Sequence, residues 1–319
     1  MFTTRSAISV FLVTMMVLGA GVVSGQNYPT KPIRIHAGSA GGSNDAVARL
    51  IASGISGPLG QPMIIENRGS VTISAPIVAQ SPPDGYTLIS AGDLIWLGPL
   101  LRGQPDALRE FSPISLISHA PNVLIVHPSL PVRSVKELIA LAKARPGELN
   151  YSTSSAGSVE HLAGELFKSM AGVKILWVPY KGSPASLTAV VGGEAQLALL
   201  GVFLVTPQVK AGRVRALAVT SAQPSALISG LPTMAASGMP GFEIVNTNAI
   251  YAPAKTPAAI VNRLNQEIVR FLNTTEAKEK TLALGGEVVI SSPEEHLAKI
   301  QSRITTLGKL IKDSGIRAE

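Results

Sequence analysis

The chain has 319 residues, of which 46% are hydrophobic and 15% charged, and its 30 glycines and 23 prolines are typical of an α/β protein with many short connections, not of a disordered chain. The absence of cysteine excludes disulfides, thiolate metal sites, a cysteine nucleophile and a lipidated cysteine anchor. The net charge is +7, but Lys and Arg are scattered and only 4% of residues are aromatic, so we predict no nucleic-acid partner.

Residues 1–25 have the features of a secretory signal peptide. Arg5 supplies a positive charge, residues 7–23 are almost entirely apolar, and the small residues Ser24 and Gly25 follow. The alternative is an uncleaved anchor, because the apolar run approaches the roughly 20 residues that span a bilayer. The small residues at its end favour cleavage, so we expect a periplasmic protein that is free of the membrane.

Short apolar strands alternate with amphipathic helices along the rest of the chain. Strands are predicted at residues 33–35, 63–65, 87–89, 123–126, 175–178, 197–199 and 216–219. Helices are predicted to begin near residue 45, after Ser134, after Thr256 and after Ser292, and Glu137 and Glu295 complete capping boxes for two of them. This alternation predicts an α/β fold with mainly parallel sheets flanked by helices.

Two breaks in this alternation suggest that the chain crosses twice between two lobes. They lie at residues 119–128 and 242–251, where His, Pro, Asn and Gly adjoin extended segments. Residues 129–243 would then form an inserted lobe, and residues 27–118 together with 244–319 would form the first lobe. A ligand would bind in the cleft between the lobes, and the two crossings would act as a hinge.

Two loops rich in Gly and Ser each follow a strand and precede a helix. The first spans residues 35–45 and contains Gly38, Ser39, Gly42, Ser43 and Asp45. The second spans residues 151–161 and contains Thr153, Ser155, Ser158 and His161. Small residues and hydroxyls at a helix N-terminus are suited to binding an anion, although each loop could equally be an ordinary capped connection.

Other candidate sites are weaker. Tyr180 and Lys181 follow a strand and could add a hydrogen-bond donor or a charge, although a packed Tyr beside a solvated Lys fits as well. The five histidines lack metal-ligand spacing, so no metal is predicted. Ser158 and His161 are the one pair that could serve a serine hydrolase, but a helix cap beside a surface histidine explains their spacing better.

Read in order, these segments resemble the substrate-binding proteins of tripartite tricarboxylate transporters, also called Bug-type receptors. The resemblance is carried by residues 28–33, 59–62, 66–68, 83–88, 121–124, 161–167, 178–182 and 215–220. It implies a two-lobed Venus-flytrap fold of the periplasmic-binding-protein type. It also implies that backbone amides, hydroxyls and ordered waters from the loops of both lobes hold the carboxylate of the ligand, and that membrane permease subunits accept it.

The chain departs from the family pattern at the loops expected to bind ligand. Relatives typically carry P-F-A-P-G-G-x-x-D in the first loop, whereas residues 37–45 here read A-G-S-A-G-G-S-N-D. Leu200 and Gly201 replace the usual Asp-Asn, and Glu160 stands where relatives often carry Gln. An added carboxylate repels an anion unless it is paired or protonated, so these changes predict a pocket that takes a less charged or more apolar solute, or one that has lost tight binding.

The sequence therefore predicts a monomeric periplasmic protein, without cofactor or enzymatic activity, that captures a small organic acid or related solute. The predicted ligand-binding residues are Gly38, Ser39, Gly42, Ser43, Asp45, Thr153, Ser155, Ser158, His161 and Tyr180. We weigh two alternatives: a signalling partner that presents the bound solute to a membrane sensor, and the hydrolase built on Ser158 and His161.

Overall fold

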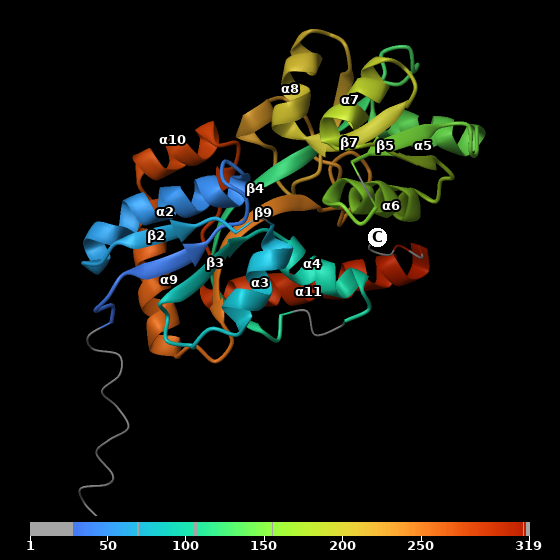
Figure 1. Ribbon diagram of the computed structural model, residues 1–319. Coiled ribbons are helices and arrows are strands. Elements are labelled where there is room, and N and C mark those ends of the chain that lie inside the picture. Colours follow the sequence, from blue (N-terminus) through green and yellow to red (C-terminus); the bar gives the residue numbers. More distant parts are fainter. Residues whose placement is uncertain (1–27, 69, 105–107, 155, 315, 317–319) are drawn as a thin grey trace, which may run out of the picture.

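The computed structural model describes residues 28–68, 70–104, 108–154, 156–314 and 316. Its strands form a mixed sheet with the order β2-β1-β3-β9-β4-β7-β5-β6, to which β8 and β10 are attached through β4. The predicted signal peptide and Ser155 lie outside the described residues. In Figure 1 two groups of strands and helices lie side by side, and the long strands β4 and β9 run between them.

The first group is built from three parallel strands that alternate with helices. These strands are β1 (Ile33–His36), β2 (Met63–Glu66) and β3 (Thr87–Ala91). The helices that belong to this group are α2 (Ser43–Leu59), α3 (Val71–Ala79), α4 (Leu94–Leu101) and α9 (Ala258–Leu272). Ile35, Ile51 and Leu264 share one buried core, so α2 and α9 cover the same face of the sheet.

The second group repeats this alternation. Its strands are β5 (Asn150–Thr153), β6 (Leu176–Pro179), β7 (Leu197–Gly201) and β8 (Arg215–Val219). Its helices are α5 (Val135–Ala144), α6 (Val159–Ala171), α7 (Ser183–Val191) and α8 (Val202–Lys210), followed by the short η1 (Ala226–Ile228). Because β5 pairs in parallel with both β6 and β7, the loops that follow these three strands reach the same edge of the sheet.

Two long strands join the groups. In β4 (Phe111–Val126), residues 111–121 pair with β9 (Val245–Pro253), and residues 122–126 pair with β7. All of these pairings are antiparallel, as are those of β8 and β10 (Glu287–Val288) with β4. The α/β class is confirmed, and the sheet is mixed because the connecting strands run against their neighbours.

The chain ends in two helices, α10 (Thr275–Ala283) and α11 (Pro293–Ser314). The predicted capping box begins α11, because Glu295 N donates to Ser292 Oγ at 3.1 Å and Ser292 N donates to Glu295 Oε2 at 2.8 Å. Helix α11 contacts both α4 and α6, one from each group. None of the helices in the described part of the chain is long and apolar enough to cross a membrane.

The predicted crossings at residues 119–128 and 242–251 overlap β4, which pairs with strands of both groups, and β9. The lobe boundaries that we infer from the sequence, and a hinge motion at these strands, stay predictions.

Candidate ligand-binding site

A cavity of about 320 Å³ lies where loops from both groups meet strand β9. Its walls come from the N-terminus of α2, the loop after β3, the N-termini of α6 and α7, and β9. The lining residues are Ser43, Asn44, Val71, Gly92, Asp93, Leu94, Ser154, Ser158, Val159, Glu160, Ser183, Asn246, Thr247 and Asn248.

A second cavity of about 240 Å³ adjoins the first, because Ser43, Asn44, Val71 and Leu94 line both. The loop between β1 and α2 contributes Gly38, Ser39 and Gly42 to its wall. Four of the predicted residues, Gly38, Ser39, Gly42 and Ser43, therefore face this cavity pair, together with Ser158 from the second loop.

Asp45 holds the first loop from beneath. Its Oδ2 accepts hydrogen bonds from Gly41 N at 2.9 Å and Arg49 Nε at 3.1 Å, and its Oδ1 accepts one from Asn67 Nδ2 at 3.0 Å. The hydrogen bond from Arg49, supported by those from Gly41 and Asn67, lowers the pKa of this carboxyl group to about 2. Asp45 is buried and lines neither cavity, so it shapes the loop and does not face the cavity space.

The turn at Gly41 requires a glycine. Its φ of 76° lies in the left-handed region, which side chains with a Cβ rarely adopt. This conformation points Gly41 N at Asp45 and brings Gly42 to the N-cap of α2.

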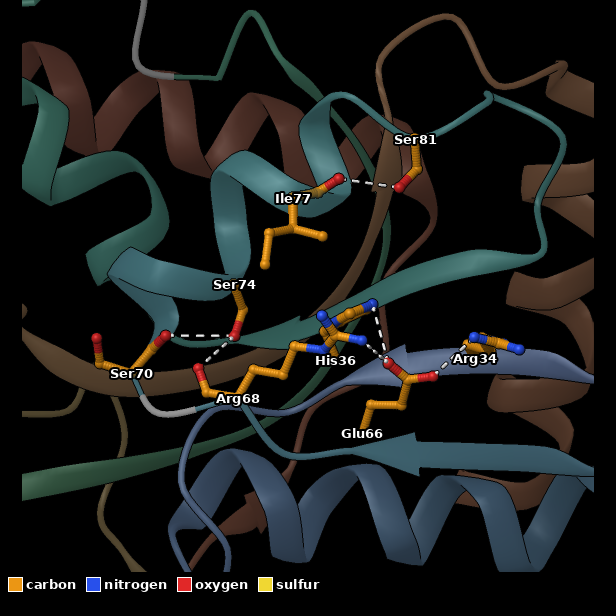
Figure 2. A network of polar contacts seen from close by, with 8 residues as sticks. All are labelled: Arg34, His36, Glu66, Arg68, Ser70, Ser74, Ile77 and Ser81. Atoms are coloured by element: carbon orange, nitrogen blue, oxygen red, sulfur yellow. Dashed lines mark hydrogen bonds and ion pairs between the residues drawn. The ribbon is translucent and has the colours of Figure 1, made fainter.

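Glu66 anchors the neighbouring loop, which leads from β2 into α3 (Figure 2). Its carboxylate pairs with Arg34 Nη1 at 3.1 Å, with Arg68 Nη2 at 3.3 Å and with His36 Nε2 at 3.7 Å. Figure 2 also shows Ser74 donating back to the carbonyl oxygens of Arg68 and Ser70. These contacts fix the start of α3, from which Val71 reaches both cavities.

Glu160 joins the second loop to α7. Its Oε2 accepts a hydrogen bond from Ser154 N at 3.0 Å, and its Oε1 accepts one from Ser183 Oγ at 2.5 Å. The carboxylate whose charge we expected to disturb an anionic ligand thus has two neutral donors and a structural role. Ser158 Oγ accepts a hydrogen bond from His161 N at 3.1 Å and caps α6.

His161 and Thr153 lie behind the cavity wall. The His161 ring stacks on Trp177 with a centroid distance of 4.1 Å, and Trp177 Nε1 donates to Thr153 Oγ1 at 2.8 Å. Gly157 N donates to His161 Nδ1 at 3.0 Å, and burial lowers the pKa of the imidazole. That ring nitrogen is occupied, and neither residue lines the cavities.

Tyr180 also lies away from the cavities. Its hydroxyl donates to Glu194 Oε2 at 3.2 Å, and its ring packs against the core beneath α7 and α8. Desolvation, together with Glu194, raises the pKa of Tyr180. The packed tyrosine was the alternative that we considered for this position.

The sequence did not single out the polar wall formed by β9 and the loop after β3. Thr247 Oγ1 and Arg303 Nη1 both donate to Asp93 Oδ1, at 2.7 and 3.0 Å, and Arg303 Nη2 donates to Val245 O at 3.1 Å. The polar residues 246–248, which interrupt an otherwise apolar strand, could have indicated this part of the cavity wall. A Cβ on Gly92 would lie 2.7 Å from Thr247 O, so this close approach requires glycine.

Comparisons with known proteins agree with this architecture. Residues 47–316 match the family described as tripartite tricarboxylate transporter family receptor. The chain is 32% identical to protein BugT of Bordetella pertussis, with 98% of this chain and 97% of that protein covered.

Solved structures of binding proteins are also similar. A structure from R. palustris with adipate has a TM-score of 0.70 and 36% identity, and covers 91% of this chain and 99% of its own. MatC from Rhodopseudomonas palustris with bound malate has a TM-score of 0.67 and 25% identity, and covers 89% of this chain and all of its own. The hydrolase alternative is therefore wrong, because the proteins of this family are carboxylate receptors and not enzymes. The chain belongs to the tripartite tricarboxylate transporter receptor family and is a solute-binding protein.

Proposed function

We propose that this protein, exported after removal of residues 1–25, captures a small carboxylate-bearing solute in the periplasm and delivers it to a tripartite-type membrane transporter. The observation that carries the proposal is the cavity of about 320 Å³, in which loops from both groups of strands converge. Cavities of this size accommodate small metabolites. Adipate and malate occupy similar proteins, which supports a carboxylate as the ligand class.

The N-termini of α2 and α6 supply the chemistry for binding a carboxylate. The first turn of an α-helix has backbone N–H groups without intrahelical partners, and the helix dipole gives this end a partial positive charge. Ser43 and Ser158, at these two N-termini, add hydroxyls to the cavity wall. Donors of this kind bind an anion reversibly without a fixed opposite charge.

Closure of the two predicted lobes around the ligand completes the proposal. The loop residues Gly38, Ser39, Gly42, Ser43 and Ser158 would contact the solute or its ordered waters, because they line the cavities. Asp45, Thr153 and His161 would act indirectly, by fixing the shape of these loops.

A thermal-shift screen of the exported chain tests this proposal. The panel contains dicarboxylates, tricarboxylates, aromatic acids, amino acids and neutral amides. A ligand at a hundredfold excess over its Kd stabilises the folded state by about 2.7 kcal/mol, so at least one carboxylate should raise Tm clearly. A panel in which no carboxylate shifts Tm contradicts the proposal.

The variant Ser43→Trp tests whether the ligand that raises Tm binds in these two cavities. Ser43 is exposed and lines both cavities, so an indole at this position should block the site and remove the shift without lowering Tm of the ligand-free protein. Thr305→Trp, on the exposed face of α11, is the matched control and should keep the full shift. An undiminished shift in Ser43→Trp would place the ligand elsewhere.

A further inference from the structure

The cavity beside β9 has walls from both strand groups, so its width depends on how the two groups are placed. Ser43 and Asp93 come from the first group, and Ser158 and Ser183 come from the second. Strand β4 pairs with strands of both groups, but its register with β9 shifts at two places, and such irregularities bend a strand. Contacts between the groups outside β4 are therefore needed to fix the separation of the walls.

One such contact joins α8 to the connection between α10 and β10. Helix α10 contacts α2 and α9 of the first group, and β10 pairs with β4. A Cβ on Gly285 would lie 2.2 Å from Phe203 Cε2, so the phenyl ring of Phe203 lies directly on the backbone of Gly285. The φ of Gly285 is 93°, so both the backbone conformation and the close approach of the ring favour glycine here.

Phe203 contributes to this contact more than to the core of its own group. Its neighbours in α8, Val202 and Val205, are buried in the core of the second group. Phe203 itself is 52% exposed, and the ring extends to the first group. The ring area that Gly285 covers therefore stabilises the placement of the two groups relative to each other.

Glu287 adds a polar contact at the same place. Its Oε1 accepts a hydrogen bond from Ala226 N at 2.7 Å, and Ala226 begins η1, which contacts α8 of the second group. Its Oε2 lies 3.4 Å from Nε2 of His119, which belongs to β4. One carboxylate on β10 thus connects the first group, the second group and the strand that pairs with both.

A contact of the same kind joins α4 to the loop before α6. A Cβ on Gly157 would lie 2.9 Å from Leu101 Cδ1, and the φ of Gly157 is 69°. Leu101 ends α4 in the first group, and Gly157 precedes Ser158, which lines the cavity. At both places a bulky apolar side chain of one group lies on a left-handed glycine of the other.

We propose that Phe203 is a positioning residue for solute binding. Together with Glu287 it clasps the two groups and sets the separation of the cavity walls in the ligand-free protein. The inference rests on the proposed function in taking the cavity beside β9 as the ligand site. Leu101 acts in the same way at the second contact, but its side chain also belongs to a hydrophobic core. Phe203 is therefore the residue at which the clasp can be tested without disturbing a core.

Double electron–electron resonance on the ligand-free exported chain tests the proposal. The chain has no cysteine, so Ala140→Cys and Gln266→Cys, on exposed positions of α5 and α9, place one spin label in each group. The labelled chain with the clasp intact should give one main distance. Phe203→Ala combined with Glu287→Ala removes a half-buried ring and a charge-assisted hydrogen bond. This change should shift the equilibrium away from the clasped arrangement at least about tenfold, seen as a second or broader distance population.

Three further variants in the same labelled background separate the clasp from a general loss of structure. Phe203→Ala alone should shift the distances in the same direction but less far. Phe203→Tyr keeps the ring and should keep the original distance. Leu176→Ala on β6 removes an apolar side chain that is 55% exposed, and it should also keep the original distance. The Tm of Phe203→Ala should be close to that of Leu176→Ala.

An unchanged distance distribution in the double variant overturns the proposal, as does an equal change in Leu176→Ala. Several distances in the labelled chain with the clasp intact would also overturn it, because the clasp would then not fix the walls. The measurement uses no ligand, so failure of the clasp leaves the proposed function standing. The thermal-shift screen decides the proposed function separately.

Discussion

Single carboxylates near the cavity serve two different purposes. Asp45 accepts three hydrogen bonds and Glu160 accepts two, and both carboxylates hold the backbone around the cavity in shape. Asp93 instead keeps one oxygen without a donor among the described residues. The sequence alone could not distinguish these two roles, because Asp45 and Asp93 each follow a parallel strand of the same sheet.

Asp45 should make the stability of the protein depend on pH in a defined window. Its folded-state pKa of about 2 lies below the ordinary value of 3.8, so its stabilising effect is present above pH 4 and is lost as the pH falls toward 2. Asp45→Asn should lower the free energy of unfolding at pH 7 by about 1–2 kcal/mol, discounted for the exposure of Arg49, and by far less at pH 2.

Urea unfolding of Asp45→Asn and wild type at several pH values measures this difference. Asp313→Asn, exposed on α11, is the control and should follow the wild type throughout. A deficit in Asp45→Asn that stays constant from pH 7 to pH 2 would show that the ionised carboxylate is not what holds the loop.

Elements that depend on local sequence were predictable, and their long-range partners were not. The capping box at Ser292 and Glu295 was found because its contacts span three residues. Asp93 and Thr247 were missed because 154 residues separate them and only the register between β3 and β9 brings them together. The two loops rich in Gly and Ser predicted about half of the residues that line the cavities. This was possible because a glycine in a turn before a helix can be recognised from its immediate sequence neighbours.

Helix α6 offers a test at this scale, because its position sets the wall that contains Ser158. A Cβ on Gly164 would lie 2.2 Å from Tyr151 Cε2, and Tyr151 is buried beneath the helix. Gly164→Ala should therefore lower the free energy of unfolding by about 1–3 kcal/mol through overpacking, which outweighs the gain in helix propensity of about 1 kcal/mol.

Chemical denaturation checks this expectation against Gly308→Ala in α11. A Cβ at Gly308 would lie 3.7 Å from Leu100 Cδ1, an ordinary contact, so this variant should be neutral or slightly more stable. If Gly164→Ala were as stable as Gly308→Ala, close packing of α6 on β5 would not be what positions the wall.

At the scale of the whole molecule, the two strand groups share β4, β9 pairs with β3 and β4, and the cavity lies beside β9. Helix α11 contacts helices of both groups, so any opening has to keep or rebuild these contacts. The alternation of strands and helices was visible in the sequence. The antiparallel pairing of the shared strands was not, since strand direction depends on where the chain crosses between the groups.

The most direct test of the account is a crystal structure of the exported chain with the acid that gives the largest thermal shift. We expect the ligand in the cavity beside β9, with its carboxylate within hydrogen-bonding distance of the N-termini of α2 or α6. We also expect the two strand groups to be closer together than in a ligand-free crystal. A ligand bound instead in the larger hollow of about 650 Å³ between α3 and α4 would contradict the central claim.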